Sequence, residues 1–375
     1  MSTKNSKETK SPARWSSETK YLELFIFACG HGDTLLVRLP DERWVLVDCY
    51  LPKHNGVRRR FFEFVDEQGI DHLALVFQTH PDYDHYLGMH DVLEHFTESE
   101  GKSVGLYVDG GLNAEQIKRL IVEPKRPGRD EYRKLQDALR RWHQQSVIVR
   151  HCGLDAERPP IFPKGFRNRI EFVPIAPDAT MTRVLTEASL QKYGTIPKAK
   201  LEANELSIVL VLAVKDDANE FNVLLSADAG VESCKRALNV WREHTEENGI
   251  SDRFNVIKVS HHGSIKNHRA ELCELGTEDS PNNVAAISAG ERSALPDRSV
   301  ISDFMKADWK VMVTTVRKER RFDRVVGLHF KRGDQLSIAQ HTIALRWNRG
   351  GQFTFGPSEA LVSESDVNAY GTAKV

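Results

Sequence analysis

Four side chains of the types that bind divalent metals fall within six residues of this 375-residue chain, namely His80, Asp82, Asp84 and His85. The apolar run 73–77 comes shortly before them and is typical of a buried strand. The first His and Asp flank Pro81 and can therefore point to one side of the chain. The second Asp and His can begin the next helix and point elsewhere. This arrangement predicts a site for two adjacent cations.

A second apolar run, 223–225, leads to the carboxylate of Asp228. The two oxygens of such a carboxylate can bridge a pair of metal ions. The same side chain can instead cap the helix that we expect over 231–244, since Asp is a preferred residue at a helix N-terminus. The sequence around Asp228 leaves both interpretations open.

A third apolar run, 256–259, is followed by two adjacent histidines, His261 and His262. Adjacent imidazoles suit a metal ligand beside a second group for proton transfer or phosphate contact, and the alternative is a polar loop with incidental His. All three sets of residues lie at the ends of predicted strands. Independent caps and turns would not need to repeat that position, so we expect one shared site.

Short β-branched runs separated by turn residues predict the strands that position these groups. We expect strands at 22–28, 34–39, 44–48, 73–79, 103–108, 147–151, 170–174, 207–214, 221–226, 255–259, 284–288 and 310–315. We expect helices at 90–96, within the charged segment 113–145, and at 231–244, 269–275 and 299–308. This order predicts an α/β (α+β) fold in which two sheets pack face to face with helices outside.

The domain organisation follows from composition along the chain. Residues 1–20 and 358–375 have little to bury and are predicted to be disordered tails. Residues 21–357 are predicted to form one domain, with polar or helical insertions at about 112–145 and 178–200; two separate α+β domains are the alternative.

The charge balance excludes a globally basic nucleic-acid binder, since 52 Lys+Arg face 53 Asp+Glu for a formal net charge of -1. Local basic clusters at 58–60, 113–145 and 317–324 leave a phosphate-binding groove open, although such clusters are usually solvated faces. No apolar run is long enough to span a bilayer, and the N-terminus has no secretory apolar segment, so we expect a cytoplasmic protein without membrane contact. Five Cys without a Cys-x-x-Cys pair leave His and carboxylates as the metal ligands.

These residues together resemble the metallo-β-lactamase superfamily, and more closely the hydrolase domain of ComEC DNA-uptake proteins and its stand-alone relatives. The resemblance covers roughly residues 22–315 and implies a four-layer αββα sandwich with the metals at one edge, between the sheets. The matching segments are Gly30-His31-Gly32-Asp33-Thr34, Val45-Leu46-Val47-Asp48, His80-Pro81-Asp82-Tyr83-Asp84-His85, Asn204-Glu205-Leu206-Ser207, His261-His262-Gly263-Ser264 and Ile287-Ser288-Ala289-Gly290.

The sequence departs from the superfamily pattern in two places. Most relatives have a third His just before the strand that starts here at Ser207, whereas this chain has Asn204, as in the ComEC-like group. An amide oxygen is a weaker ligand than imidazole, and His151 is the alternative donor. The ComEC-like group also often has a Gly-His-Pro segment where this chain has Ala294-Leu295-Pro296, which puts a secondary substrate contact in doubt.

The resemblance assigns the ligands to two divalent ions. One ion is held by His80 and Asp82 with Asn204 near it, the other is held by Asp84, His85 and His261, and Asp228 bridges them. Asp82 stands where relatives have His, and oxygen ligands favour Mn²⁺ or Mg²⁺ over Zn²⁺. We expect Mn²⁺ or Zn²⁺, with Mn²⁺ preferred and Mg²⁺ as a further candidate.

Other roles are expected for the remaining polar residues. Asp84 and His262 are the predicted catalytic residues, with His262 as general acid or as a contact to the scissile phosphate. The Gly263 amide and Ser264 are predicted to donate to a phosphate oxygen. Asp33 and Asp48 are predicted to be structural, or to orient ligand imidazoles or bind metal.

The predicted function is a metal-dependent phosphodiesterase or nuclease that acts on DNA, RNA or a nucleotide through an activated water. One alternative is hydrolysis of a small ester, lactone, thioester or β-lactam. Another is a regulated effector with protein partners in a multi-protein system, which could belong to anti-phage defence. Identification of the substrate would distinguish these three functions.

Overall fold

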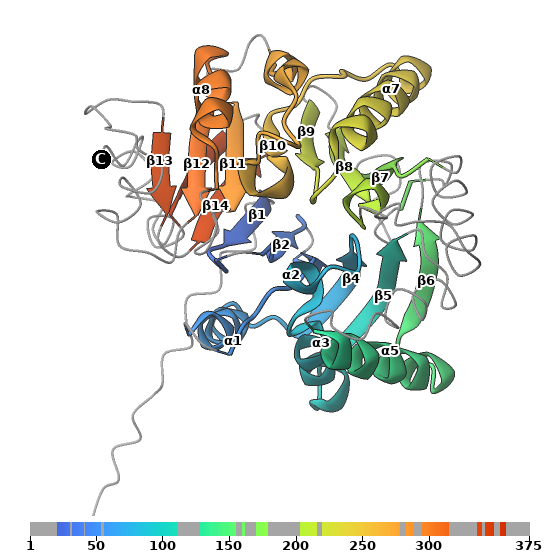
Figure 1. Ribbon diagram of the computed structural model, residues 1–375. Helices are drawn as coiled ribbons and strands as arrows, with labels where there is room; N and C mark the ends of the chain where they lie inside the picture. The colour runs from blue at the N-terminus through green and yellow to red at the C-terminus, as the bar shows by residue number, and fades with distance from the viewer. Residues whose placement is uncertain are drawn as a thin grey trace, which may run out of the picture.

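Two β-sheets packed face to face form the centre of the protein in a computed structural model (Figure 1). The structure describes residues 21–30, 32–40, 42–53, 56–110, 128–154, 160–161, 170–178, 203–215, 220–277, 283–288, 295–314, 336–339, 342–348 and 353–357. Of the predicted tails and insertions, 1–20, 358–375, 112–127 and 179–200 lie outside these residues.

The first sheet has eight strands in the order β15-β14-β1-β2-β3-β4-β5-β6. Their bounds are β1 Tyr21–Phe27, β2 Leu35–Arg38, β3 Trp44–Val47, β4 His72–Gln78, β5 Ser103–Gly110, β6 Val149–Leu154, β14 Thr342–Asn348 and β15 Phe353–Pro357. The neighbours from β3 to β6 run parallel, so their carboxyl ends meet at one edge of this sheet.

The second sheet has seven strands in the order β13-β12-β11-β10-β9-β8-β7. Their bounds are β7 Ile170–Ala176, β8 Val209–Lys215, β9 Glu220–Leu225, β10 Val256–Lys258, β11 Val284–Ser288, β12 Lys310–Thr314 and β13 Leu336–Ala339. The neighbours from β9 to β13 run parallel and likewise bring their carboxyl ends together.

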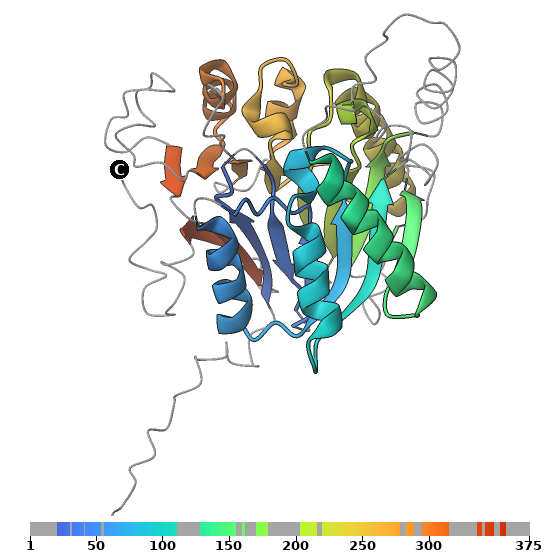
Figure 2. The same ribbon diagram turned by 60° about the horizontal axis from the view of Figure 1, so that its bottom comes forward.

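Helices cover the outer faces of both sheets. The helices α1 (Val57–Glu67), α3 (Met89–Glu98) and α5 (Arg129–Gln144) lie on the first sheet, as Figure 2 shows. The helices α7 (Val231–Asn248) and α8 (Arg298–Lys306) lie on the second. The four layers are those of the predicted αββα sandwich. Among the described residues, none of the helices has the length and apolar character needed to cross a membrane.

Alternation of side chains along the strands builds three apolar layers. In β1, Phe25 and Phe27 pack toward the helices, while Leu24 and Ile26 point between the sheets. Successive side chains of a strand point to opposite faces, which is why buried strands on both sides read as continuous apolar runs. The layer between the sheets is apolar throughout most of its area, so polar groups gather only at its edge.

Most predicted elements are present, with four differences. The helix α1 was not predicted. The strands β13, β14 and β15 were not predicted, although β14 pairs with β1 in the first sheet. The helix predicted at 269–275 is a 3₁₀ helix, η3 (Ala270–Leu275). The segment predicted to be helical over 113–145 contains α5, which begins at Arg129, after the two prolines that interrupt the pattern.

Candidate metal centre

The predicted ligands lie where the carboxyl ends of the parallel strands of both sheets meet. On the side of the first sheet, His80 lies just after β4. Asp84 and His85 lie in the short helix α2 (Tyr83–Tyr86). Asp228 follows β9, and the 3₁₀ helix η2 (Ser260–Gly263) follows β10 on the second sheet's side. Clefts outside the carboxyl ends of parallel strands are the usual binding positions in open α/β sheets.

Four side chains from the two sheets converge on one point. Asp84, His85, Asp228 and His262 each place one potential ligand atom within 4.8 Å of the others. His85 Nε2 lies 3.4 Å from Asp228 Oδ1, and His262 Nε2 lies 3.6 Å from Asp84 Oδ2 and 3.8 Å from Asp228 Oδ2. The sheets therefore contribute two ligand candidates each, and the tertiary structure brings together residues that are up to 178 positions apart (84 to 262).

Hydrogen-bond acceptors fix the tautomer of His85 and of His80. Asp48 Oδ2 accepts the Nδ1–H of His85 at 2.7 Å. The Thr79 hydroxyl donates to the same Asp48 oxygen at 2.6 Å, so its own oxygen is left to accept the Nδ1–H of His80 at 3.1 Å. In both imidazoles the proton is on Nδ1, and the lone pair is on Nε2.

His262 has the same tautomer through a partner on the second sheet. Its Nδ1 lies 3.2 Å from the Ser288 carbonyl oxygen, which can only accept a hydrogen bond. Its Nε2 is therefore the nitrogen with the lone pair, and that nitrogen faces Asp84 and Asp228. Metal-binding histidines characteristically donate their second ring N–H to a carboxylate or carbonyl in this way.

The atoms aimed into the cluster fit a divalent cation. His80 Nε2, His85 Nε2 and Asp228 Oδ1 are buried and make no hydrogen bond within the described part of the chain. Buried polar atoms without such a bond are costly unless another partner satisfies them. Imidazole nitrogens with lone pairs and carboxylate oxygens are the ligands of Zn²⁺ and Mn²⁺, so divalent ions bound at this edge would satisfy these atoms.

The electrostatics of the cluster agree with this geometry. Burial lowers the pKa of His80 to about 3, with the neighbouring His85 adding to the effect, so the ring is neutral and able to bind metal. Burial opposes ionisation of Asp228, but His262 and His85 outweigh it and hold its pKa well below the ordinary value. Burial also disfavours the charged form of His85, but Asp228 and Asp48 raise its pKa well above the ordinary value.

A strained backbone supports the cluster. Asp48, Ala227, His261 and His262 all have positive φ, at 55°, 45°, 46° and 55°. Such conformations cost of order 1–3 kcal/mol each in non-glycine residues and collect at functional sites. Here they occur at Asp48, directly before Asp228, and in the adjacent residues His261 and His262.

The remaining predicted ligands lie around this cluster. His80 Nε2 is 3.9 Å from Asp82 Oδ2, which agrees with the predicted pairing of these two residues. Asn204 Nδ2 lies 2.7 Å from His261 Nδ1, and that nitrogen is 3.6 Å from Asp228 Oδ2. The structure thus joins His261 to Asn204 and brings His262 into the four-residue cluster. His151 lies on β6, two strands away from β4.

Three further predictions concern Asp228, Gly263 and Ser264. The N-terminal cap of α7 is Gly230, so Asp228 is not the helix cap that one interpretation of the sequence offered. The Ser264 amide donates to the His261 carbonyl at 3.0 Å, and a contact of its hydroxyl with substrate stays a prediction. A Cβ at Gly263 would come within 2.6 Å of Pro296 Cβ, and its φ is +77°, so this position requires glycine.

Thr79, Lys258 and Ser288 were missed as site residues. Lys258 was treated as part of a buried strand, and it is 1% exposed, with its ammonium donating to Asp33. A charged residue inside an otherwise apolar run was the signal that could have identified it, because buried Lys is rare without a partner. The partners of Thr79 and Ser288 are set by the packing of the sheets and left no mark in the sequence.

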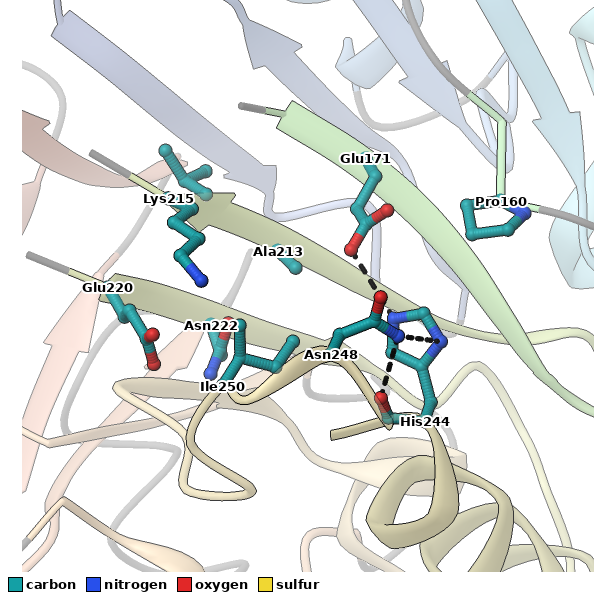
Figure 3. A pocket seen from close by; sticks show the side chains of 10 residues that line it. Pro160, Glu171, Ala213, Lys215, Glu220, Asn222, His244, Asn248 and Ile250 are labelled. Atoms are coloured by element: carbon teal, nitrogen blue, oxygen red, sulfur yellow. Dashed lines mark hydrogen bonds and ion pairs between the residues drawn. The ribbon is translucent and has the colours of Figure 1, made fainter. Parts of the chain in front are cut away.

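The other features lie away from this cluster. His90, Asp91 and Glu94 approach one another on α3, where Arg58 neutralises Asp91 at 2.5 Å. A cavity of about 590 Å³ lies at the amino end of β9, lined by Glu171, Lys215, Glu220 and His244 among others (Figure 3). His244 Nε2 lies 3.4 Å from Glu171 Oε1 there. None of the residues that line this cavity is among the predicted ligands.

The basic cluster at 58–60 is largely neutralised. Arg58 pairs with Asp91, and Arg59 pairs with Glu63 at 2.8 Å. On α5, Arg141 lies 3.9 Å from Glu98. These clusters agree with solvated faces, and the cluster at 317–324 lies outside the described residues.

Comparison with known proteins gives a family match for part of the chain. Residues 28–155 match the model of the Metallo-beta-lactamase superfamily. No curated protein matches the chain. Similar solved structures include the metallo-beta-lactamase fold protein YhfI from Bacillus subtilis, with 10% identity and a TM-score of 0.38, over 86% of this chain and 98% of that one.

Two other similar structures have comparable values. A diphosphatase from the PhnP family has 12% identity and a TM-score of 0.39, over 86% of this chain and 97% of that one. A long form RNase Z from yeast has 9% identity and a TM-score of 0.37, over 92% of this chain and 43% of that one.

The matched residues 28–155 run from the end of β1 to the end of β6 and contain the segment from His80 to His85. The remaining strands form the second sheet and complete the four layers that the sequence predicted. The family match therefore covers the strands β2 to β6 of the first sheet, and the two sheets together have the sandwich architecture that the sequence predicted.

Proposed function

We propose that this protein is a metal-dependent phosphodiesterase with a dinuclear site, acting on DNA, RNA or a nucleotide. One observation carries the proposal. His80, His85 and His262 each place Nδ1 against a hydrogen-bonding partner, while Nε2 of His85 and His262 faces Asp228 and Asp84 and Nε2 of His80 faces Asp82. This arrangement presents imidazole nitrogens and carboxylate oxygens together at one edge of the sandwich.

The residues divide into two ligand sets in this proposal. His80 and Asp82 form the first set, with Asn204 beside it, and Asp84 and His85 form the second. Asp228 has Oδ1 near His85 and Oδ2 near His262, and it is the residue that would bridge the two ions in this proposal. Of the two adjacent histidines, the geometry supports His262 for the second set, although the family resemblance suggested His261.

Two divalent ions at these sets would supply an activated water and neutralise the charge that develops on a phosphate. The protein's own residues orient that chemistry. Asp48 holds the rings of His80 and His85 through hydrogen bonds. The half-buried ring of His261 and the hydroxyl of Ser264 lie next to the cluster and can donate to a substrate oxygen. The carboxylates Asp82 and Asp84 favour a hard ion, which supports Mn²⁺.

The ComEC-like motifs support a phosphodiester substrate. The segment from His80 to His85 has Asp at its second ligand position, and Asn204 stands where most relatives have a third His. Both features match that group. A role with protein partners, including in anti-phage defence, is a further proposal that rests on the same motifs.

The test is cleavage by metal-free protein to which Mn²⁺, Zn²⁺ or Mg²⁺ is added. The substrates are labelled single- and double-stranded DNA and RNA, a small phosphodiester and a neutral ester. We expect phosphodiester cleavage that requires metal and is lost in the double variant Asp84→Ala/His85→Ala. The matched control, Asp66→Ala/His72→Ala, removes the same residue types outside the site and should retain activity.

The outcomes separate the alternatives. Cleavage of the neutral ester alone would replace the phosphodiesterase proposal with the small-ester alternative. Two bound ions per chain without any cleavage would favour an effector that needs a partner. A chain that binds no divalent ion would overturn the enzymatic proposal altogether.

A further inference from the structure

A buried ion pair lies directly beneath the candidate metal cluster. Asp33 and Lys258 are each 1% exposed, and the Lys258 ammonium donates to Asp33 Oδ2. Asp33 belongs to the turn between β1 and β2 of the first sheet, whereas Lys258 is the last residue of β10 in the second. The pair therefore connects the two sheets at the edge where the ligands meet.

The pair contacts the ligand segments on both sides of the gap. The Asp33 amide donates to the Asp84 carbonyl at 3.1 Å, which holds the first sheet's ligand helix. The Lys258 ammonium lies 3.4 Å from the carbonyl of Ala227, the residue before Asp228. One ion pair thus touches the chain next to a ligand from each sheet.

Asp33 also contacts the residue that orients His262. Its Oδ1 accepts a hydrogen bond from the Ser288 hydroxyl and lies 3.9 Å from His262 Nδ1. The Ser288 carbonyl accepts the Nδ1–H of His262. The position of the Asp33 carboxylate therefore helps to set the position of Ser288 and, through it, the direction of His262 Nε2.

Burial of an ion pair is not an efficient way to stabilise a fold. Removing two charges from water costs several kcal/mol per ion, and apolar residues of similar volume often serve as well or better. The layer between these sheets is apolar elsewhere, so an apolar pair would fit the architecture. An apolar pair could not hold the Ala227 carbonyl and the Ser288 hydroxyl through directed hydrogen bonds. These side-chain contacts also fix the position of Asp33, whose backbone amide holds Asp84.

Lys258 would also prevent Asp33 from competing for a metal ion. Asp33, Asp48 and His85 place ligand atoms within 4.8 Å of one another, so Asp33 could compete for an ion at this edge. The ammonium of Lys258 occupies one of its carboxylate oxygens and the Ser288 hydroxyl the other. Because both of its carboxylate oxygens accept these hydrogen bonds, Asp33 would influence the ligands through its contacts and would not bind an ion itself.

We propose that Asp33 and Lys258 are a positioning pair that sets the distance between the first-sheet ligand Asp84 and the second-sheet ligands Asp228 and His262, and thereby the spacing of the two ions. The inference rests on the metal site of the proposed function. It does not depend on the substrate, because neither residue contacts the place where a substrate would bind.

The experiment compares wild type with Lys258→Met, Asp33→Asn and the double variant Asp33→Asn/Lys258→Met. Mn²⁺ affinity is measured by calorimetry, the coupling between the two ions by electron paramagnetic resonance, and stability by denaturant unfolding. We expect each single variant to lose stability and to bind Mn²⁺ about 10–100-fold more weakly, the range typical of residues behind metal ligands.

The double variant distinguishes positioning from a purely structural role. It contains no unpaired buried charge, so its stability should recover toward that of wild type. We expect its Mn²⁺ affinity to stay low and the spectrum of the coupled ions to stay altered. Recovery of both affinity and spectrum together with stability would overturn the positioning role.

A matched control uses a buried ion pair away from the site. Glu23 and Arg346 join β1 to β14, and the double variant Glu23→Gln/Arg346→Met should change stability without changing Mn²⁺ affinity. Wild-type protein that binds Mn²⁺ but cleaves no phosphodiester would refute the proposed substrate and leave this inference standing. Wild-type protein that binds no Mn²⁺ would refute both.

Discussion

Asp48 Oδ2 accepts the Nδ1–H of His85 at 2.7 Å, although the two residues belong to different segments, after β3 and in α2. The same carboxylate reaches His80 through the Thr79 hydroxyl. One buried acid therefore orients an imidazole in each of the two proposed ligand sets. Burial raises the pKa of Asp48, while His85 and Thr79 oppose that rise.

This relationship predicts the effect of Asp48→Asn. An amide keeps the volume, but it offers only one acceptor oxygen and turns donors toward groups that need acceptors. We expect Mn²⁺ affinity to fall about 10–100-fold, as for other residues that hold metal-binding histidines. Calorimetric titration of the metal-free protein with Mn²⁺ measures this affinity, and the variant Asp66→Asn, at an exposed position, is the control. An unchanged affinity would show that Asp48 is structural only.

The two adjacent histidines should differ in their effect on metal binding. His262 lies in the four-residue cluster and is 1% exposed, whereas His261 is partly exposed and bonded to Asn204. We expect His262→Asn to reduce the metal content from two ions to one, and His261→Asn to leave the content near two while lowering activity. Elemental analysis after dialysis decides between them, and the reverse pattern would restore the assignment made by family resemblance.

Removal of metal should lower stability. Asp84 and Asp228 lie close together, and a bound ion adds stabilisation that grows with its concentration over its dissociation constant, about 2.7 kcal/mol at a hundredfold excess. We expect a chelator to lower the melting temperature and Mn²⁺ to restore it. The melting temperature of the variant Asp84→Ala/His85→Ala should not respond to chelator or Mn²⁺. If the melting temperature of the wild type also fails to respond, that result would argue against a metal site.

The pairing of β14 with β1 can be tested through Glu23. Its carboxylate accepts hydrogen bonds from Arg346 Nε at 2.8 Å and from Arg38 at 3.1 Å in a buried position. Breaking a buried pair leaves charges uncompensated and costs about 3–5 kcal/mol. We expect Glu23→Gln to lower the free energy of unfolding by that amount. The exposed partner of Arg38 gives the control, since Glu42→Gln should cost less than about 1 kcal/mol.

Acid sensitivity is expected from His268, which lies outside the metal site. Burial lowers the pKa of His268, with Asp303 opposing, so the unfolded chain binds a proton more readily than the folded one. Stability should therefore fall as the pH drops below the ordinary His pKa of about 6.5, with a slope of at most about 1.4 kcal/mol per pH unit. In metal-free protein, His268→Gln should flatten that slope. If His268→Gln and wild type have the same dependence of stability on pH, His268 is not the cause of the acid sensitivity.

Local patterns were sufficient to predict most of the fold. The strand β4 is an apolar run that ends at polar turn residues, and the same description holds for β9 and β10. Each of these patterns depends on the residues within one element. The strand β14 was missed because its place in the first sheet depends on pairing with β1, more than 300 residues away, and β15 in turn pairs with β14.

The sequence by itself determined which residue types end the strands, and hence that His80, Asp84, His85 and Asp228 could bind metal. Only the tertiary structure decided how these groups are held. Asp48 reaches His85 across 37 residues, and Lys258 reaches Asp33 across 225. The choice of His262 over His261 for the cluster depends on backbone angles and on Ser288 of a neighbouring strand. Such contacts arise from the register and packing of two sheets. They join residues that are far apart in the chain, so no local sequence pattern predicts them.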